Sequence, residues 1–282
     1  MALHFSMARV SQTLKRFTFP VINRIRFGFG KYSSEKRGLD DLAFASRVDN
    51  KTPVFVYQMG KVASTAIYQG LLKTESKELV FHSHSFEPFH TNKEIRLLFR
   101  YYQKYKPPIR IISLVREPVT RNISAFFQNL RRDGNKKALT SELPIEKIKS
   151  MFLRNYPHEI PLIWFDNNIK KHFDIDVYER EFPKAGYLKF QKDNVELLLM
   201  RHDLANVTKE LLIGEFTGVS GLKLSQDNVG NDKRYAELYA KFKETKLPLS
   251  HLFYLASSKY MKHFFYPEMR QILESWSEEG LP

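Results

Sequence analysis

Residues 53–72 read PVFVYQMGKVASTAIYQGLL and decide the fold. The run Val54–Tyr57 is apolar and β-rich, and a segment with apolar residues at helical spacing follows Ser64. The pattern predicts a strand, a short loop around Gly60 and a helix that starts at Ser64 or the next residue. Such a helix directs free backbone N–H groups and its positive dipole end into the loop, where Lys61 adds a cation. The sequence therefore predicts an anion-binding site at this turn.

This loop differs from the Walker phosphate loop of nucleotide triphosphatases. Phe55 occupies the position of the first glycine, and Val62 follows Lys61 where that loop has a Ser or Thr that binds Mg²⁺. An ordinary nucleotide triphosphatase is therefore disfavoured. Taken alone, the stretch is equally compatible with a strand–helix turn that carries one solvated lysine.

A second stretch of the same kind covers residues 109–127, IRIISLVREPVTRNISAFF. The run Ile109–Val115 is almost entirely apolar, as expected of a parallel strand that is covered on both faces. Pro118 suits the first turn of a following helix. Arg116 at the strand end and Ser124 within the helix can converge on one anion, because Arg offers a fork of donors and Ser a short hydroxyl.

The two stretches resemble the signatures of sulfotransferases that use 3′-phosphoadenylyl sulfate (PAPS). MGKVAST resembles the 5′-phosphosulfate loop of the membrane-associated carbohydrate enzymes, with Met59 where eukaryotic relatives often have Pro. VREPVTRNISAFF resembles the 3′-phosphate motif R-[DE]-P-x-x-R-x-x-S-x-[FY] almost position for position. The resemblance implies that Arg116 and Ser124 hold the 3′-phosphate. It also implies that the phosphosulfate is held by Gly60, Lys61, Ala63, Ser64 and Thr65.

The resemblance extends over most of residues 53–220 and carries an expectation of the fold. A generic sulfotransferase pattern, R-x-[ED]-L followed by a helix and F-x-G, is matched by Arg201, Asp203, Leu204, Phe216 and Gly218. We expect an α/β fold, a P-loop-like three-layer sandwich with a mostly parallel central sheet of about 4–5 strands flanked by helices. A helical C-terminal part follows. This domain would span residues 51–282, preceded by a basic N-terminal arm and linker over residues 1–50, with residues 33–51 as a polar linker.

The next predicted strand, Glu78–His84 (ELVFHSH), ends in two histidines. His82 and His84 alternate, so they share a face at the carboxyl end of the strand, where ligands collect in open α/β sheets. Histidine titrates in the range that a general base needs, but a histidine pair that caps a strand explains the pattern as well. Uronyl 2-O-sulfotransferases carry a similar H-x-H, and this resemblance implies His84 as the base and His82 as a helper. Glu87 and His90 are the nearby alternatives, and two histidines without a third ligand argue against a metal site.

The composition narrows the range of partners. The chain has 282 residues, with 45 Lys and Arg against 31 Asp and Glu, a net charge of +14. Such a surface favours anionic partners, but the chain carries no zinc-finger or RNP-type signature, so we expect no nucleic acid. The absence of cysteine excludes disulfides, thiolate zinc sites and cysteine nucleophiles.

Residues 1–30 mix Arg and Lys with Phe, Val and Ile. A loosely ordered arm or a helix packed on the domain is favoured, because Pro20 and the pair Gly28 and Gly30 interrupt the pattern. The alternative is a basic amphipathic segment that lies on an anionic membrane. No apolar run reaches the roughly 20 residues that a bilayer requires, and no signal-peptide pattern is present. We therefore expect a cytoplasmic protein, peripheral to the inner face of the membrane if the arm binds lipid.

A late loop, Asn228–Asp232, precedes the helix that begins near Lys233. A loop of this kind covers the cofactor in sulfotransferases, so the resemblance implies that Asn228 and Lys233 contact PAPS; a helix cap is the alternative. A bacterial group linked to capsular polysaccharide synthesis has an N-K-W-Y-S signature near here. This chain is similar, but it reads DKRYA over residues 232–236, with Trp and Ser replaced.

The expected function is transfer of a sulfuryl group from PAPS to a hydroxyl of a carbohydrate acceptor, such as a capsular or cell-surface polysaccharide, without a metal. Lys61 would stabilise the leaving group and His84 would deprotonate the acceptor. A P-loop kinase acting on a sugar or nucleotide and a non-enzymatic polyanion-binding module are the alternatives. The residue after Lys61 and the Arg116–Ser124 pair argue against the first, and the two spaced anion motifs argue against the second.

Overall fold

The computed structural model describes residues 34–75, 79–86, 91–132, 143–225 and 233–278, without the side chains of residues 34–37, 131–132 and 233–235. The chain divides into two compact units, residues 1–43 and residues 44–282. The described part of the first unit, residues 34–43, is helical and belongs to α1 (Ser34–Val48). No described helix is both long enough and apolar enough to cross a membrane.

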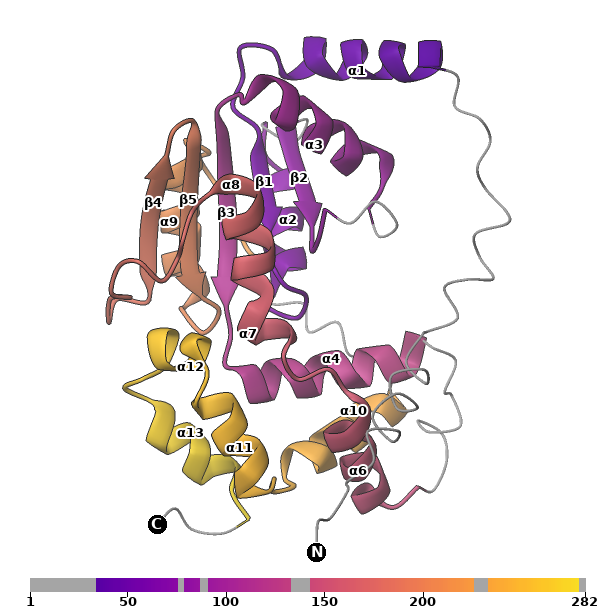
Figure 1. The fold of residues 1–282 in the computed structure, drawn as a ribbon, viewed down its shortest axis with the longest axis vertical. Helices are drawn as coiled ribbons and strands as arrows, with labels where there is room; N and C mark the ends of the chain where they lie inside the picture. The colour runs from indigo at the N-terminus through magenta and orange to yellow at the C-terminus, as the bar shows by residue number, and fades with distance from the viewer. Residues whose placement is uncertain (1–33, 76–78, 87–90, 133–142, 226–232, 279–282) are drawn as a thin grey trace, which may run out of the picture. The chain divides into compact units, whose positions relative to one another are not determined.

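The second unit is built on a five-stranded sheet with the order β2-β1-β3-β5-β4 (Figure 1). Strands β1 (Val54–Tyr57), β2 (Val80–Ser83), β3 (Ile109–Val115) and β5 (Val195–Arg201) run parallel, and β4 (Tyr187–Lys192) pairs antiparallel with β5. The expected α/β class with a mostly parallel sheet is therefore confirmed. The carboxyl ends of the four parallel strands share one edge of the sheet, and the loops that follow them build the site.

Helices cover both faces of the sheet, which makes three layers. On one face, the rings of Phe55 and Tyr57 pack with aromatic residues near α3 (Lys93–Tyr105) and α7 (Ile160–Phe165). The other face carries α2 (Ser64–Leu72) and α9 (Asn206–Thr217). Because β1 and β3 have both faces covered, all their residues except Arg110 are buried, as the unbroken apolar runs predict.

A mainly helical part adjoins this carboxyl edge of the sheet. The helices outside the sheet layers are α4 (Pro118–Arg132), α6 (Ile145–Asn155), α10 (Lys233–Lys243), α11 (Leu249–Ala256), α12 (Lys259–Phe264) and α13 (Met269–Trp276); a π-turn η6 (Asp166–Lys170) and α8 (Lys171–Phe173) continue α7. Most of them enclose a second apolar core around Phe127, Phe152 and Phe242. Helix α12 instead packs on the sheet core through Tyr260 and Phe264.

One local expectation was wrong. Residues 33–51 were expected to form a polar linker, but Ser34–Val48 form helix α1. Phe44 and Val48, four residues apart, are both buried in the sheet core, and Arg47 forms an ion pair with Glu94 of α3. A mostly polar segment can form a helix when two apolar residues on one face pack against the rest of the protein.

Candidate functional site

The loop between β1 and α2 has a backbone conformation that suits an anion. Lys61 and Ala63 both have positive φ angles, 72° and 65°, and Ala63 is the residue before the first turn of α2. Residues in the left-handed region that alternate with other turn conformations point successive backbone N–H groups inward and form an anion-binding concavity. Gly60 and Lys61 are half-buried, Ser64 is buried, and Ala63 and Thr65 are exposed at the mouth.

The N-terminus of α2 is open. Ala63 has no side chain that can accept a hydrogen bond, and no side-chain cap bonds to the first turn. Free N–H groups and the positive dipole end of a helix attract anions within about one turn. The predicted helix start at Ser64 is confirmed, and its donors are available to a ligand.

Arg116 joins the second predicted anion motif to the first. It follows β3, and its Nη1 donates to the carbonyl oxygen of Lys61 at 2.9 Å, while its Nε donates to the Thr120 hydroxyl at 3.3 Å. The Lys61 residue and the Arg116 guanidinium therefore lie on the same side of the molecule.

Arg121 completes a cluster of three cations. It lies on α4 with only 4% of its surface exposed, and its Nε donates to the carbonyl oxygen of Gly60 at 3.0 Å. Burial lowers the pKa of Lys61, and the nearby charges of Arg116 and Arg121 lower it further. None of these three side chains forms an ion pair with any carboxylate in the described parts of the chain. Three close cations that form no ion pair with a described carboxylate favour binding of an anion, although the Glu117 carboxylate lies near enough to Arg116 to interact with it electrostatically.

His84 lies directly after β2 and faces the same loop. Its Nδ1 is 2.9 Å from the carbonyl oxygen of Gln58, so Nδ1 carries the proton and Nε2 keeps its lone pair. A Cβ at Gly60 would lie 3.9 Å from Nε2, which places this edge of the ring against the loop. Loss of solvent lowers the pKa of His84; the bond to Gln58 opposes this, and Arg121 and Lys61 lower the pKa further. The accessible Nε2 is thus a neutral acceptor at physiological pH.

His82 occupies a more enclosed position beside His84. The two rings are 4.9 Å apart, edge to face, and His82 also stacks on Tyr68 of α2. Burial, and then His84, lower its pKa to about 4. Its buried Nε2 has no hydrogen-bond partner among the described residues. The two histidines meet on one face, as predicted from their spacing, but no hydrogen bond joins their rings in the described structure.

The N-terminus of α4 is closed by a side chain of the protein itself. The carboxylate of Glu117 accepts hydrogen bonds from the backbone N–H groups of Val119 and Thr120, at 2.5 and 2.8 Å. Burial raises the pKa of Glu117, and these hydrogen bonds oppose the shift. A ligand at this end of the site therefore meets side chains rather than free helix N–H groups.

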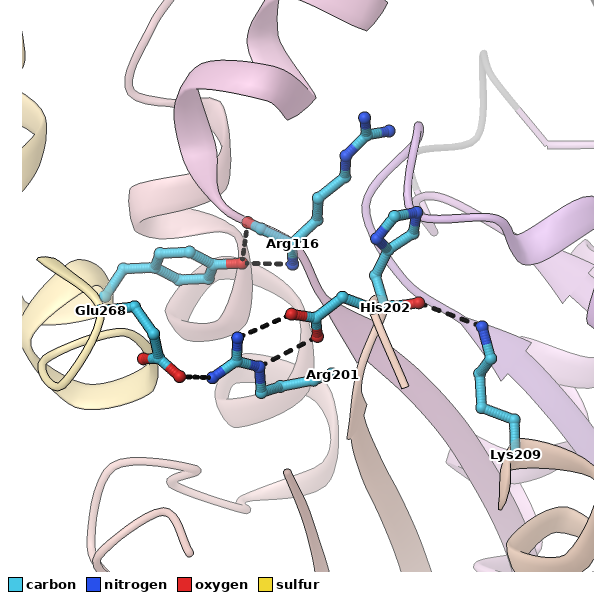
Figure 2. A network of polar contacts seen from close by, with 7 residues as sticks. Arg116, Arg201, His202, Lys209 and Glu268 are labelled. Atoms are coloured by element: carbon cyan, nitrogen blue, oxygen red, sulfur yellow. Dashed lines mark hydrogen bonds and ion pairs between the residues drawn. The ribbon is translucent and has the colours of Figure 1, made fainter. Parts of the chain in front are cut away.

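A cavity of about 430 Å³ opens beside Arg116, between the ends of β3 and β5. Its lining includes Glu117, Thr120, His202 and Phe265. Figure 2 shows the His202 ring and the Arg116 side chain extending to the same side. Burial lowers the pKa of His202 to about 4, with further contributions from Arg116 and Lys209. The cavity thus combines a neutral ring and an apolar ring with two arginines and three carboxylates, those of Glu117, Asp203 and Glu268.

Two contacts from the C-terminal helices fix the walls of this cavity (Figure 2). The Tyr260 hydroxyl donates to the backbone oxygen of Arg116 at 2.9 Å and accepts from its backbone nitrogen at 3.0 Å. Arg201 holds Asp203 through two hydrogen bonds, at 3.0 and 2.7 Å, and Glu268 at 2.5 Å. Helix α12 and the turn that follows it therefore hold the ends of β3 and β5.

The structure describes only some of the remaining predicted residues. Ser124 lies on α4, three residues after Arg121. Its surface is 9% exposed, and its hydroxyl forms no hydrogen bond among the described residues. Asn228, Glu87 and His90 lie outside the described residues, as do residues 1–30 and the side chain of Lys233. Within the described ranges, no group of three or more potential metal ligands occurs.

Sequence reasoning missed four residues at the site. Arg121 stood inside the quoted motif without an assigned role, and its place as the second arginine of that motif was the available signal. Tyr156, His202 and Tyr260 had no local signal, because only tertiary contacts bring them to the site.

Comparison with known protein families gives a match to part of the chain. A family described as "Putative capsular polysaccharide synthesis protein" matches residues 138–266, which is less than half of the chain and begins after both anion motifs. No curated protein and no solved structure matches the chain. Over residues 138–266 this chain is thus similar to proteins linked to the synthesis of capsular polysaccharides.

Proposed function

We propose that this protein transfers a sulfuryl group from PAPS to a hydroxyl of a polysaccharide. The observation that carries the proposal is the cluster of Lys61, Arg116 and Arg121 around the open N-terminus of α2, without a carboxylate partner among the described residues. A doubly phosphorylated nucleotide supplies the missing negative charge at both ends of this cluster.

The nucleotide would lie across the carboxyl ends of three neighbouring strands. Its 5′-phosphosulfate would occupy the loop after β1, where Lys61, Ser64 and the first turn of α2 supply donors. Its 3′-phosphate would bind Arg116 and Ser124 after β3. The adenosine would enter the cavity beside His202, at the end of β5. This path follows the general rule that ligands of open α/β sheets bind at the carboxyl ends of the strands.

Transfer would then be an in-line displacement at sulfur. A bond forms between the acceptor oxygen and sulfur, and the bond between sulfur and the bridging phosphate oxygen breaks. Its electron pair leaves with adenosine 3′,5′-bisphosphate (PAP). Lys61 and the N-terminus of α2 would stabilise the charge that grows on the bridging oxygen. The helix donors are fixed by the backbone before the reaction, and Arg116 holds the backbone carbonyl of Lys61.

His84 would take the proton of the acceptor hydroxyl on Nε2. The Gln58 carbonyl holds the tautomer that this role requires, and the lowered pKa keeps the ring unprotonated. His82 would pack behind the ring and fix its orientation.

The polysaccharide acceptor is supported by the match of residues 138–266 to a capsular polysaccharide synthesis family. Incubation with ³⁵S-labelled PAPS and a panel of capsular and cell-surface polysaccharides tests the whole proposal. We expect label in the polysaccharide fraction for wild type and a loss of label for His84→Ala with retained PAP binding.

Transfer of ³²P from γ-labelled ATP, without transfer of ³⁵S, would instead assign the protein to the kinases. Binding of PAP with full turnover by His84→Ala would move the role of base to another residue, such as His82, Glu87 or His90.

A further inference from the structure

We propose that Arg121 is a positioning residue that holds the phosphosulfate loop, by tying the Gly60 carbonyl to Tyr156 at the end of α6. The inference deepens the proposed function and rests on it for the identity of the ligand. Its geometric part, a loop held by a buried guanidinium, can be tested without any nucleotide.

The guanidinium of Arg121 bridges three elements. Its Nε bonds to the Gly60 carbonyl at 3.0 Å, and its Nη1 bonds to the Tyr156 hydroxyl at 2.7 Å and to the Asn122 amide oxygen at 3.0 Å. Asn122 in turn donates to the carbonyl of His158 at 3.0 Å. The loop after β1 is thereby connected to the segment between α6 and α7.

Arg121 is an unusual side chain for such a bridge. A buried charge without a carboxylate partner is costly, so it persists where its hydrogen bonds fix a geometry that function requires. Only the planar fork of an arginine can reach a carbonyl on one side and a hydroxyl on another at the same time. Its second terminal nitrogen, Nη2, has no partner among the described residues and is available to a bound anion.

The contact to Gly60 is significant because Gly60 also lies against the His84 ring. Moving the Gly60 carbonyl would displace the Lys61 backbone on one side and the surroundings of His84 Nε2 on the other. Arg121 thus sets the relation between the cation that would meet the leaving group and the base that would meet the acceptor.

Three variants separate geometry from charge. Arg121→Lys keeps the positive charge and loses the fork, Arg121→Met loses both, and Tyr156→Phe removes a single hydroxyl that anchors the fork. Tyr178→Phe is the matched control, because the buried Tyr178 hydroxyl has no hydrogen-bond partner among the described residues.

The first readout is amide hydrogen exchange of residues 60–63 in the ligand-free protein. We expect faster exchange in both Arg121 variants, a smaller increase in Tyr156→Phe, and no change in Tyr178→Phe. The second readout is the pKa of His84, which is measured through the NMR signal of its ring. Its value should rise in Arg121→Met and stay low in Arg121→Lys, because Arg121 is one of the charges that lower it.

The third readout is PAP affinity by calorimetry, where loss of one hydrogen bond in Tyr156→Phe should weaken binding by about 3- to 10-fold. Unchanged loop exchange in folded Arg121→Lys and Tyr156→Phe would overturn the inference. If wild type binds no PAP, the proposed function fails while the exchange experiment still decides whether Arg121 holds the loop. If the Arg121 variants fail to fold, Tyr156→Phe decides alone.

Discussion

The helices α2 and α4 both start at the site, but their N-termini are built differently. The N-terminus of α2 follows Ala63, which cannot cap it, so its first N–H groups face the loop that holds Lys61. The N-terminus of α4 follows Glu117, whose carboxylate already accepts the N–H groups of Val119 and Thr120. One helix end is open to an anion and the other is occupied by a carboxylate of the protein.

This difference indicates that the protein binds the two ends of the proposed nucleotide in different ways and for different purposes. At α2, backbone donors and a dipole are fixed before the ligand arrives, which suits stabilisation of charge that develops during a reaction. At α4, recognition depends on side chains, Arg116 and Ser124, which suits binding of a charge that does not change. The open end should therefore govern turnover and the closed end should govern affinity.

Removing the cation at the open end should have the largest effect. Lys61→Ala should slow sulfuryl transfer by about 10²–10³-fold, by analogy with losing one preorganised donor to a developing oxyanion. Single-turnover rates with ³⁵S-PAPS measure this effect, and Lys73→Ala, at the exposed end of the same helix, is the control. An equal loss in PAP affinity, without a loss of rate in the bound complex, would contradict this difference between the two ends.

Removing the cation at the closed end should affect binding instead. Arg116→Ala should weaken PAP by about 10- to 100-fold, the value of a hydrogen bond to a charged group, and weaken adenosine 5′-phosphosulfate much less because that molecule lacks the 3′-phosphate. Calorimetry with both nucleotides checks the difference. Arg110→Ala, at the opposite end of β3, should weaken neither. Equal losses for the two nucleotides would reject the assignment of Arg116.

A fall in pH should destabilise the folded protein through a histidine at each end of the site. His82 lies beside α2 and His202 beside Arg116, and the pKa of each is lowered to about 4, from 6.5, mainly by burial. Between pH 6.5 and about 4 the unfolded chain binds protons that the folded protein excludes, so stability is greatest above 6.5 and declines as pH falls. Each histidine should contribute on the order of 1–3 kcal/mol to this loss.

Urea unfolding followed at several pH values measures this dependence. Replacing His202 or His82 by Phe should flatten the curve in this range. An unchanged slope in both variants would show that neither ring is held neutral in the folded protein.

Removing the carboxylate that caps α4 should have the smallest effect, and this effect is on stability. Glu117→Ala removes the cap of α4 and should lower the free energy of unfolding by about 0.5–2 kcal/mol, as for other N-caps. Gln retains an oxygen acceptor, so Glu117→Gln should lose less. Thermal unfolding of the two variants separates these outcomes, and an alanine variant as stable as wild type would remove Glu117 from this role.

The sequence predicted the elements that carry their own signal. The strand, loop and helix at Ser64 and the strand at Ile109–Val115 followed from apolar runs and from Pro118, and all are confirmed. Helix α1 was missed because its polar composition hides two buried residues that only tertiary packing reveals. The supports of the site, Tyr156 and Tyr260, were missed for the same reason. Tyr260 is 144 residues from Arg116, and no local pattern predicts such a contact.

The most direct test of the central claim is a comparison of nucleotide affinities by calorimetry on the wild-type protein. If one ligand spans Lys61 and Arg116, PAP should bind more tightly than either 5′-AMP or 3′-AMP, each of which engages only one end. The double variant of Lys61→Ala and Arg116→Ala should lose that advantage. Affinities for PAP and 5′-AMP that are equal in wild type would contradict the account, because the two motifs would then not share a ligand.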